Sequence, residues 1–159
     1  MPNTTYKINE HVICKGKGVA EITDIIKRED IDFYVLRFFH EDFEVKIPTT
    51  NNDSIRRPIL KKEVVGLFEF LEVKDLDIKK ENWNKRSKKY TDKLRNGSIY
   101  DIADIIRELN ASKNIKTELS FGEKKIFEKA KELIVQELAL FEDFTTDELN
   151  LKIDACLAN

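Results

Sequence analysis

The chain has 159 residues, 41% of them hydrophobic and 36% charged, a composition that predicts a globular protein with a strongly charged surface. No apolar run is long enough to span a bilayer and the N-terminus has no signal-peptide core, so we expect a cytoplasmic protein without a membrane partner. Two cysteines and two histidines, none at metal-ligand spacing, give no reason to expect a metal.

The formal net charge of -2 conceals an uneven distribution along the chain. Between Lys79 and Arg95, eight basic residues accompany only two acidic ones, which gives a local charge of +6. Beyond Asn114, six lysines accompany ten acidic residues, which gives -4. A basic block within an acidic protein is a candidate contact for a polyanion, although the usual meaning of such a run is a solvated helix face.

The first third of the chain predicts β-strands. Short segments rich in β-branched and aromatic residues occupy positions 11–15, 18–25, 32–39 and 43–48. In the last of these, Phe43, Val45 and Ile47 alternate with charged residues, the pattern of a half-buried strand. Gly16 and Gly18 predict a turn. Residues 1–60 are therefore expected to form a small, barrel-like antiparallel sheet.

The rest of the chain predicts helices, so the expected fold class is α+β. Residues 61–81 are interpreted as a helix and linker, and residues 82–159 as an all-helical domain. The first helix has apolar residues at helical spacing: Val64, Val65, Leu67, Phe68 and Leu71. Later helix starts carry N-cap residues, namely Asn82, Ser98, Ser120 and Thr145, and the last three form possible capping boxes with Asp101, Glu123 and Glu148. In the helix that follows Ser98, the residues expected to face inward are Ile99, Ile102, Ile105, Ile106 and Leu109. Asn96-Gly97 predicts a helix end.

The sequence contains none of the common catalytic motifs. There is no G-x-S-x-G, P-loop, G-x-G-x-x-G or H-E-x-x-H, and the carboxylates fall beside lysines on charged helix faces. Lys15-Gly16-Lys17-Gly18 resembles a phosphate loop only superficially, because no helix follows it. We therefore expect a binding protein rather than an enzyme, with no cofactor and no small-molecule substrate.

Several motifs combined make the sequence more specific. Trp83 is followed by basic residues, and the next helix contains Ala103, Arg107 and Leu109 in an A-x-x-x-R-x-L pattern. The segment LSFGEKKIFEKAKELIVQELAL, from Leu119, fits an LS-x-G-E…A…L…E-L-A pattern. Near the N-terminus, Gly16-Lys17-Gly18-Val19 fits a G-x-G turn. Together these features resemble the CarD family of bacterial transcription regulators over roughly residues 6–157.

The resemblance implies a protein with two functional parts. A Tudor-like N-terminal domain would bind the β subunit of RNA polymerase, with Arg28 and Lys46 as the matching basic contacts. The helical domain would bind promoter DNA at the upstream edge of the transcription bubble. There Trp83 would insert into the minor groove, supported by Lys85, Arg86, Lys88 and Lys89. The expected result is a more stable open complex. The protein itself is expected to act as a monomer at the nucleoid.

Each of these residues also has a simpler interpretation. Trp83 shares a helical face with Tyr90 and Leu94, so the pattern alone favours a core position, and only the resemblance favours a DNA contact. Lys46 lies on an alternating strand, where an exposed residue is expected in any case. Arg107 stands alone in an apolar helix and is expected to pair internally. Two other functions remain possible: a nucleic-acid-binding protein that acts without polymerase, and a protein–protein adaptor.

Overall fold

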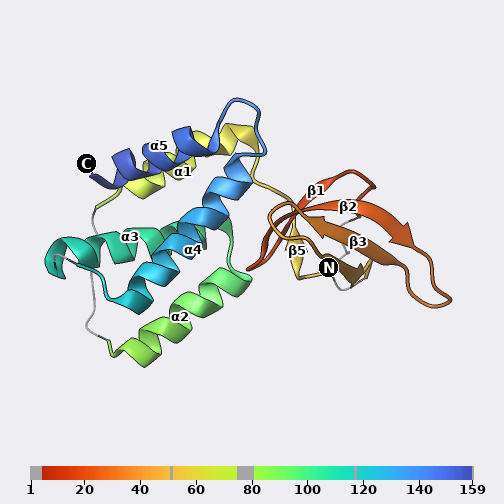
Figure 1. Cartoon of the computed structure of the whole chain (residues 1–159), viewed down its shortest axis with the longest axis horizontal. Coiled ribbons are helices and arrows are strands. Elements are labelled where there is room, and N and C mark those ends of the chain that lie inside the picture. The colour runs from red at the N-terminus through yellow and green to blue at the C-terminus, as the bar shows by residue number, and fades with distance from the viewer. Residues whose placement is uncertain (1–4, 51, 75–80, 117, 159) are drawn as a thin grey trace. The chain divides into compact units, whose positions relative to one another are not determined.

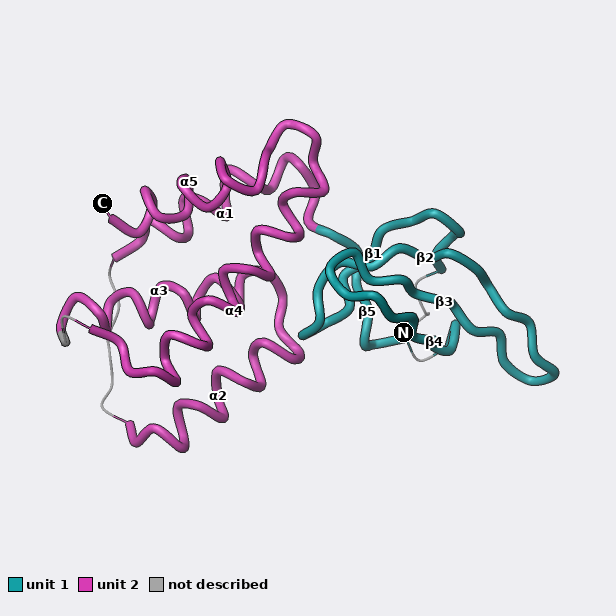
Figure 2. The backbone as a smooth tube through the Cα atoms, viewed as in Figure 1, with its two compact units in different colours: residues 1–58 teal, residues 59–159 magenta. Residues whose placement is uncertain are grey.

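The computed structural model describes residues 5–50, 52–74, 81–116 and 118–158 (Figure 1). The backbone divides into two compact units, Met1–Pro58 and Ile59–Asn159 (Figure 2). Strands make up the first unit and helices the second, which confirms the α+β class. Lys79 and Lys80 of the basic block, and most of the expected linker, lie outside the described residues.

The first unit is one antiparallel sheet of five strands in the order β4-β3-β2-β1-β5. The strands are β1 (His11–Cys14), β2 (Gly18–Ile26), β3 (Phe33–Phe38), β4 (Glu44–Pro48) and β5 (Ile55–Arg56). The pairing of β2 with β3 shifts register between Ile22 and Asp24, and such an irregularity increases the local twist. The sheet curls into a half-barrel (Figure 1). The strand order makes β4 and β5 its two edge strands.

A small apolar core fills the concave side of this sheet. Val12, Ala20, Ile22 and Leu36 are fully buried, and the Tyr6 ring meets the Tyr34 ring edge-on at 5.8 Å. The β1–β2 turn confirms its prediction, because Gly16 and Gly18 both adopt positive φ, at 80° and 116°. One expectation needs correction, because Phe43 remains 39% exposed while stacking on Phe38. The short strand β5 lies in a segment where the sequence indicated no strand.

The second unit packs five helices among its described residues around a single core (Figure 1). They are α1 (Val64–Glu72), α2 (Trp83–Asn96), α3 (Ile99–Lys116), α4 (Phe121–Leu138) and α5 (Thr146–Ala158), with a short 3-10 turn, η1 (Lys61–Glu63), before α1. Helix α3 packs against α1, α2 and α4, and α1 lies beside α5. Cys14 and Cys156 are buried free thiols.

Helical periodicity predicted most of this core. The expected stripe of α3 is buried throughout, with Ile105, Ile106 and Leu109 at 0% exposure, and each such side chain stabilises the fold by roughly 1.5–3 kcal/mol. The capping pairs are also present, since Asp101 N–H donates to the Ser98 hydroxyl and Glu123 N–H to the Ser120 hydroxyl. Val65 contradicts its prediction, because it is 66% exposed on α1.

Candidate nucleic-acid interface

Helix α2 lies at the surface of the helical unit and carries the predicted DNA contacts. It packs against α3 and α4, yet Tyr90 is the one residue of this helix that is buried. Its start is fixed by Asn82, whose side-chain oxygen accepts a hydrogen bond from the Lys85 backbone N–H at 2.9 Å. This cap makes Trp83 the first residue of the helix and sets the direction in which its side chain leaves the backbone.

The Trp83 indole is neither sealed in the core nor fully exposed, with 38% of the residue accessible. One part of the ring lies against Gly122 at the start of α4. A Cβ at position 122 would stand 2.7 Å from Cζ2 of the indole, closer than carbon atoms can approach. Gly122 therefore allows the ring to lie close against the start of α4, while the indole remains partly accessible to solvent. The chain contains no other tryptophan.

Arg86 lies on the same face of α2 as Trp83 and is held inside the helical unit. Its Nη2 donates to Glu123 Oε2 at 3.0 Å and to the Tyr90 hydroxyl at 3.4 Å. Its Cζ lies 5.8 Å from the centre of the Trp83 ring, a cation–π distance. The side chain of Arg86 is 17% exposed and that of Glu123 is 1% exposed. Of the cations predicted to bind DNA, Arg86 is thus the one whose side chain pairs with another residue that the structure describes.

Burial and pairing have opposite effects on the ionisation of this group. Burial alone would lower the pKa of the Arg86 guanidinium, but the hydrogen bonds to Tyr90 and Glu123 raise it above its ordinary value. Burial raises the pKa of the Tyr90 phenol, and the hydrogen bond from Arg86 opposes that rise. The arginine therefore stays charged and the tyrosine neutral over the physiological range.

The three predicted lysines have a different environment. Lys85, Lys88 and Lys89 are exposed and form no ion pair with any residue that the structure describes. Further along α2, Lys93 binds Asp104 of α3 at 2.8 Å, so its charge is already neutralised. The first half of α2 therefore presents three lysines that no described residue pairs, within six positions of a partly exposed indole.

Arg107 confirms its predicted internal role. Its Nε donates to the Val73 carbonyl oxygen at 3.3 Å, its Nη1 lies 3.5 Å from Asp104, and its guanidinium covers the Phe70 ring at 4.3 Å. This arginine joins the end of α1 to α3.

The predicted polymerase contacts belong to the first unit. Lys46 is an exposed residue of β4, and Arg28 is an exposed residue just beyond β2. The strand register aligns Ile26, Phe33 and Pro48 across the sheet. Arg28 follows the first of these by two residues and Lys46 precedes the last by two, so the two cations lie toward the same end of the sheet.

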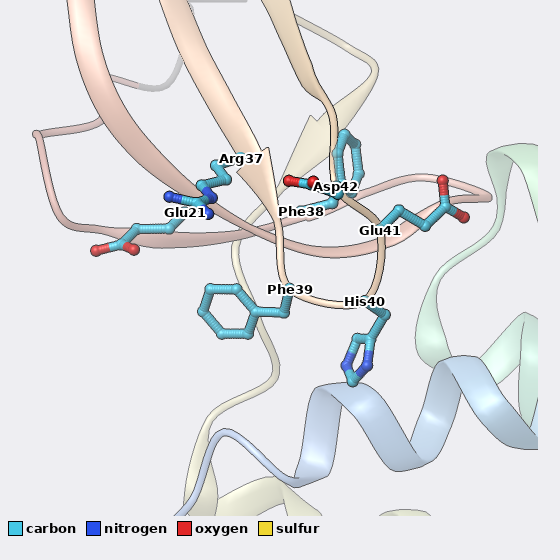
Figure 3. A pocket seen from close by; sticks show the side chains of 7 residues that line it. All are labelled: Glu21, Arg37, Phe38, Phe39, His40, Glu41 and Asp42. Atoms are coloured by element: carbon cyan, nitrogen blue, oxygen red, sulfur yellow. The ribbon is translucent and has the colours of Figure 1, made fainter.

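The opposite end of this sheet has an open pocket, shown in Figure 3, lined by Glu21, Arg37, Phe38, Phe39, His40, Glu41 and Asp42. Its side chains diverge, with Phe39 and His40 pointing away from Asp42 (Figure 3). Within the described ranges, no group of three or more His, Cys, Asp or Glu residues could hold a metal ion, and no helix is long and apolar enough to cross a membrane.

Sequence reasoning missed two partners of the predicted site. Ser120 and Glu123 were recognised as a capping box, but the same carboxylate also binds Arg86, which lies 37 positions earlier in the chain. Gly122 was noted only as part of a motif. A glycine in the first turn of an otherwise good helix signals close approach of another group, here the indole.

Two family models match consecutive parts of the chain. Residues 6–59 match the CarD-like/TRCF RID domain, and residues 66–154 match the CarD C-terminal domain. The chain belongs to the CarD family. The resemblance inferred from the motifs is thereby confirmed, and so is the Tudor-like character of the N-terminal sheet.

A protein of Bacillus subtilis (strain 168) named "Putative transcription factor YdeB" is 27% identical over 153 residues, which cover 91% of this chain and 97% of that protein. The RID-type domain and the CarD C-terminal domain identify a transcription-related protein that interacts with RNA polymerase.

Proposed function

We propose that this CarD-family protein holds RNA polymerase and promoter DNA together and stabilises the open complex. Residues 1–60 bind the β subunit of polymerase, residues 61–81 contribute the first helix and a linker, and residues 82–159 bind DNA at the upstream edge of the bubble. The protein acts as a monomer at the nucleoid and needs neither catalysis nor a cofactor.

The observation that carries this proposal is the partial exposure of the Trp83 indole. A large aromatic ring that is 38% exposed, supported from behind by Gly122, stands at the start of a surface helix. Aromatic and apolar side chains of this kind insert between base steps of DNA, and aromatic rings stack on unpaired bases. A core anchor would instead be enclosed, as Tyr90 is at 3% exposure.

The position of the ring suits a DNA fork better than an intact duplex. Inserting a side chain between stacked bases costs a few kcal/mol in duplex DNA. At the edge of a bubble the strands have already separated, so the insertion no longer requires that cost, and stacking contributes on the order of 1–3 kcal/mol. An interaction that favours the open form by about 1.4 kcal/mol shifts the opening equilibrium tenfold.

The exposed lysines supply affinity without sequence preference. Lys85, Lys88 and Lys89 have no intramolecular partner among the described residues, so they can neutralise phosphates and release bound counterions. The ring then selects the separated strands, while the cations hold the nearby backbone.

Reversing these three charges tests the DNA contact. We expect the combined variant Lys85→Glu, Lys88→Glu, Lys89→Glu to lose most of its affinity for a forked duplex. The slope of log K against log salt concentration should fall by up to about three, because each lost phosphate contact removes about 0.9. Fluorescence anisotropy of a labelled fork over a series of salt concentrations measures both quantities.

The matched control reverses three exposed lysines elsewhere in the helical unit, Lys62, Lys113 and Lys152. Long-range charge alone would weaken binding equally in both variants, and that result would contradict a specific role for α2. Retention of fork affinity by the control, together with its loss in the α2 variant, supports the proposed interface.

The polymerase contact has a separate test. Lys46→Glu should weaken binding to purified RNA polymerase about tenfold. The change replaces an exposed cation of the proposed interface with a negative charge, which would repel the acidic partner expected on polymerase. Lys17→Glu, at an exposed position in the β1–β2 turn, is the control. Biolayer interferometry with the full chain measures both, and equal affinities would remove Lys46 from the proposed contact.

A further inference from the structure

Two residues, Arg86 of α2 and Gly122 of α4, lie against the Trp83 ring, and Glu123 of α4 holds Arg86 in place. Gly122 supports the ring from one direction, with room for no Cβ at that position. Arg86 lies three residues after Trp83, so it is a neighbour on the same helix face, and its guanidinium carbon is 5.8 Å from the ring centre. The residue after Gly122, Glu123, holds Arg86 through a 3.0 Å ion pair.

The carboxylate of Glu123 is itself fixed in place. Its Oε1 accepts the Ser120 backbone N–H at 3.0 Å, and its own N–H donates to the Ser120 hydroxyl at 3.2 Å. Its Oε2 is then directed at Arg86. One buried side chain therefore caps α4 and anchors α2, so the start of α4 sets the position of both residues that contact the indole.

The same contacts make Arg86 a poor phosphate ligand. Nη2 is already shared between Glu123 and Tyr90, and the side chain is only 17% exposed. Turning outward to a phosphate would leave a carboxylate with 1% exposure without its arginine, which is strongly unfavourable. Lys88, exposed and without an ion pair to a described residue, has no such cost.

We propose that Arg86 is a positioning residue, which orients the Trp83 ring through its buried pair with Glu123 rather than by binding DNA phosphate. This inference rests on the proposed role of Trp83 in the open complex. Arg86 affects the open complex only through the orientation of the Trp83 ring, and Gly122 supports the same ring from α4.

The salt dependence of fork binding separates the two roles of a cation. Lys88→Gln removes a phosphate contact and should lower the slope of log K against log salt by about one. Arg86→Gln should leave the slope at the wild-type value while shortening the open-complex lifetime at least threefold. Arg86→Lys, which keeps the positive charge but not the planar guanidinium group, should restore the lifetime only in part.

The single tryptophan gives a direct readout of the ring. Arg86→Gln and Glu123→Gln should both increase acrylamide quenching of Trp83 and shift its emission to the red, whereas Lys88→Gln should change neither. An Arg86→Gln protein with wild-type emission and a slope reduced by one would overturn the proposal, since that is the behaviour of a phosphate ligand.

Gly122→Ala tests the support without removing any charge. The new Cβ meets the end of the Trp83 side chain rather than backbone, so the ring must move while the helix remains intact. Alanine also favours a helix more than glycine does. We expect unchanged or higher thermal stability, altered Trp83 emission and a shorter open-complex lifetime, and wild-type emission and lifetime would count against the support.

A parallel Trp83→Ala measurement keeps the two proposals apart. If Trp83→Ala leaves the lifetime unchanged, the proposed function fails, while the emission spectra still decide whether Arg86 and Gly122 position the ring. If Trp83→Ala shortens the lifetime and Arg86→Gln does not, only the positioning role fails.

Discussion

Replacing Trp83 with alanine should remove most of the open-complex stabilisation while leaving the fold and polymerase binding intact. The stacking that is lost is worth on the order of 1–3 kcal/mol, which corresponds to a lifetime about 5–150-fold shorter than with the wild-type protein. The fold should tolerate the change because Trp83 is 38% exposed at the first position of α2 and Tyr90 anchors that helix. Competitor challenge of preformed open complexes measures the lifetime.

Two further variants make this result specific to the ring. Trp83→Phe retains a smaller aromatic surface and should give an intermediate lifetime. Ile115→Ala removes another exposed apolar side chain, 73% accessible on α3, and should behave as wild type. A Trp83→Ala protein that prolongs open complexes as well as wild type would exclude an action through the indole.

Removing the Glu123 carboxylate should destabilise the helical unit strongly, because this buried side chain both pairs with Arg86 and caps α4. Glu123→Ala leaves the Arg86 guanidinium, 17% exposed, without its acidic partner and takes the cap from the Ser120 N–H. The combined loss is about 2–4 kcal/mol. Urea unfolding of the full chain, followed by circular dichroism at helical wavelengths, gives the change in midpoint.

A conservative and a distant variant isolate the two contributions. Glu123→Gln keeps an oxygen for the cap but loses the ion pair, so it should be less destabilising than Glu123→Ala. Glu128→Ala alters an exposed carboxylate of the same helix and should change stability by less than about 0.5 kcal/mol. Equal midpoints for Glu123→Ala and Glu128→Ala would mean that the buried pair contributes nothing net.

The sequence predicted helices correctly where apolar periodicity and capping residues agree. Helix α3 has a regular apolar stripe and a capping pair at its start, and both were found as expected. Val65 was misplaced because the width of the buried face of α1 depends on the helices packed against it, which the apolar pattern alone does not give. Strand β5 was missed because only two residues, in a polar segment, pair with β1.

The site, like the fold, was predictable only where local sequence decides the structure. Exposure of Lys85, Lys88 and Lys89 follows from their charge and density along one helix. The partner of Arg86 does not follow, because the pairing with Glu123 depends on how α2 packs against α4. The degree to which Trp83 is buried depends on that same packing, so periodicity alone could not distinguish a core anchor from a partly exposed ring.

The most direct measurement is the lifetime of open promoter complexes formed by purified RNA polymerase, with and without the full-length protein at saturating concentration. Stabilisation of the separated strands by Trp83 predicts a lifetime several-fold longer when the protein is present. Equal lifetimes, with binding of the protein to polymerase verified in the same samples, would contradict this role.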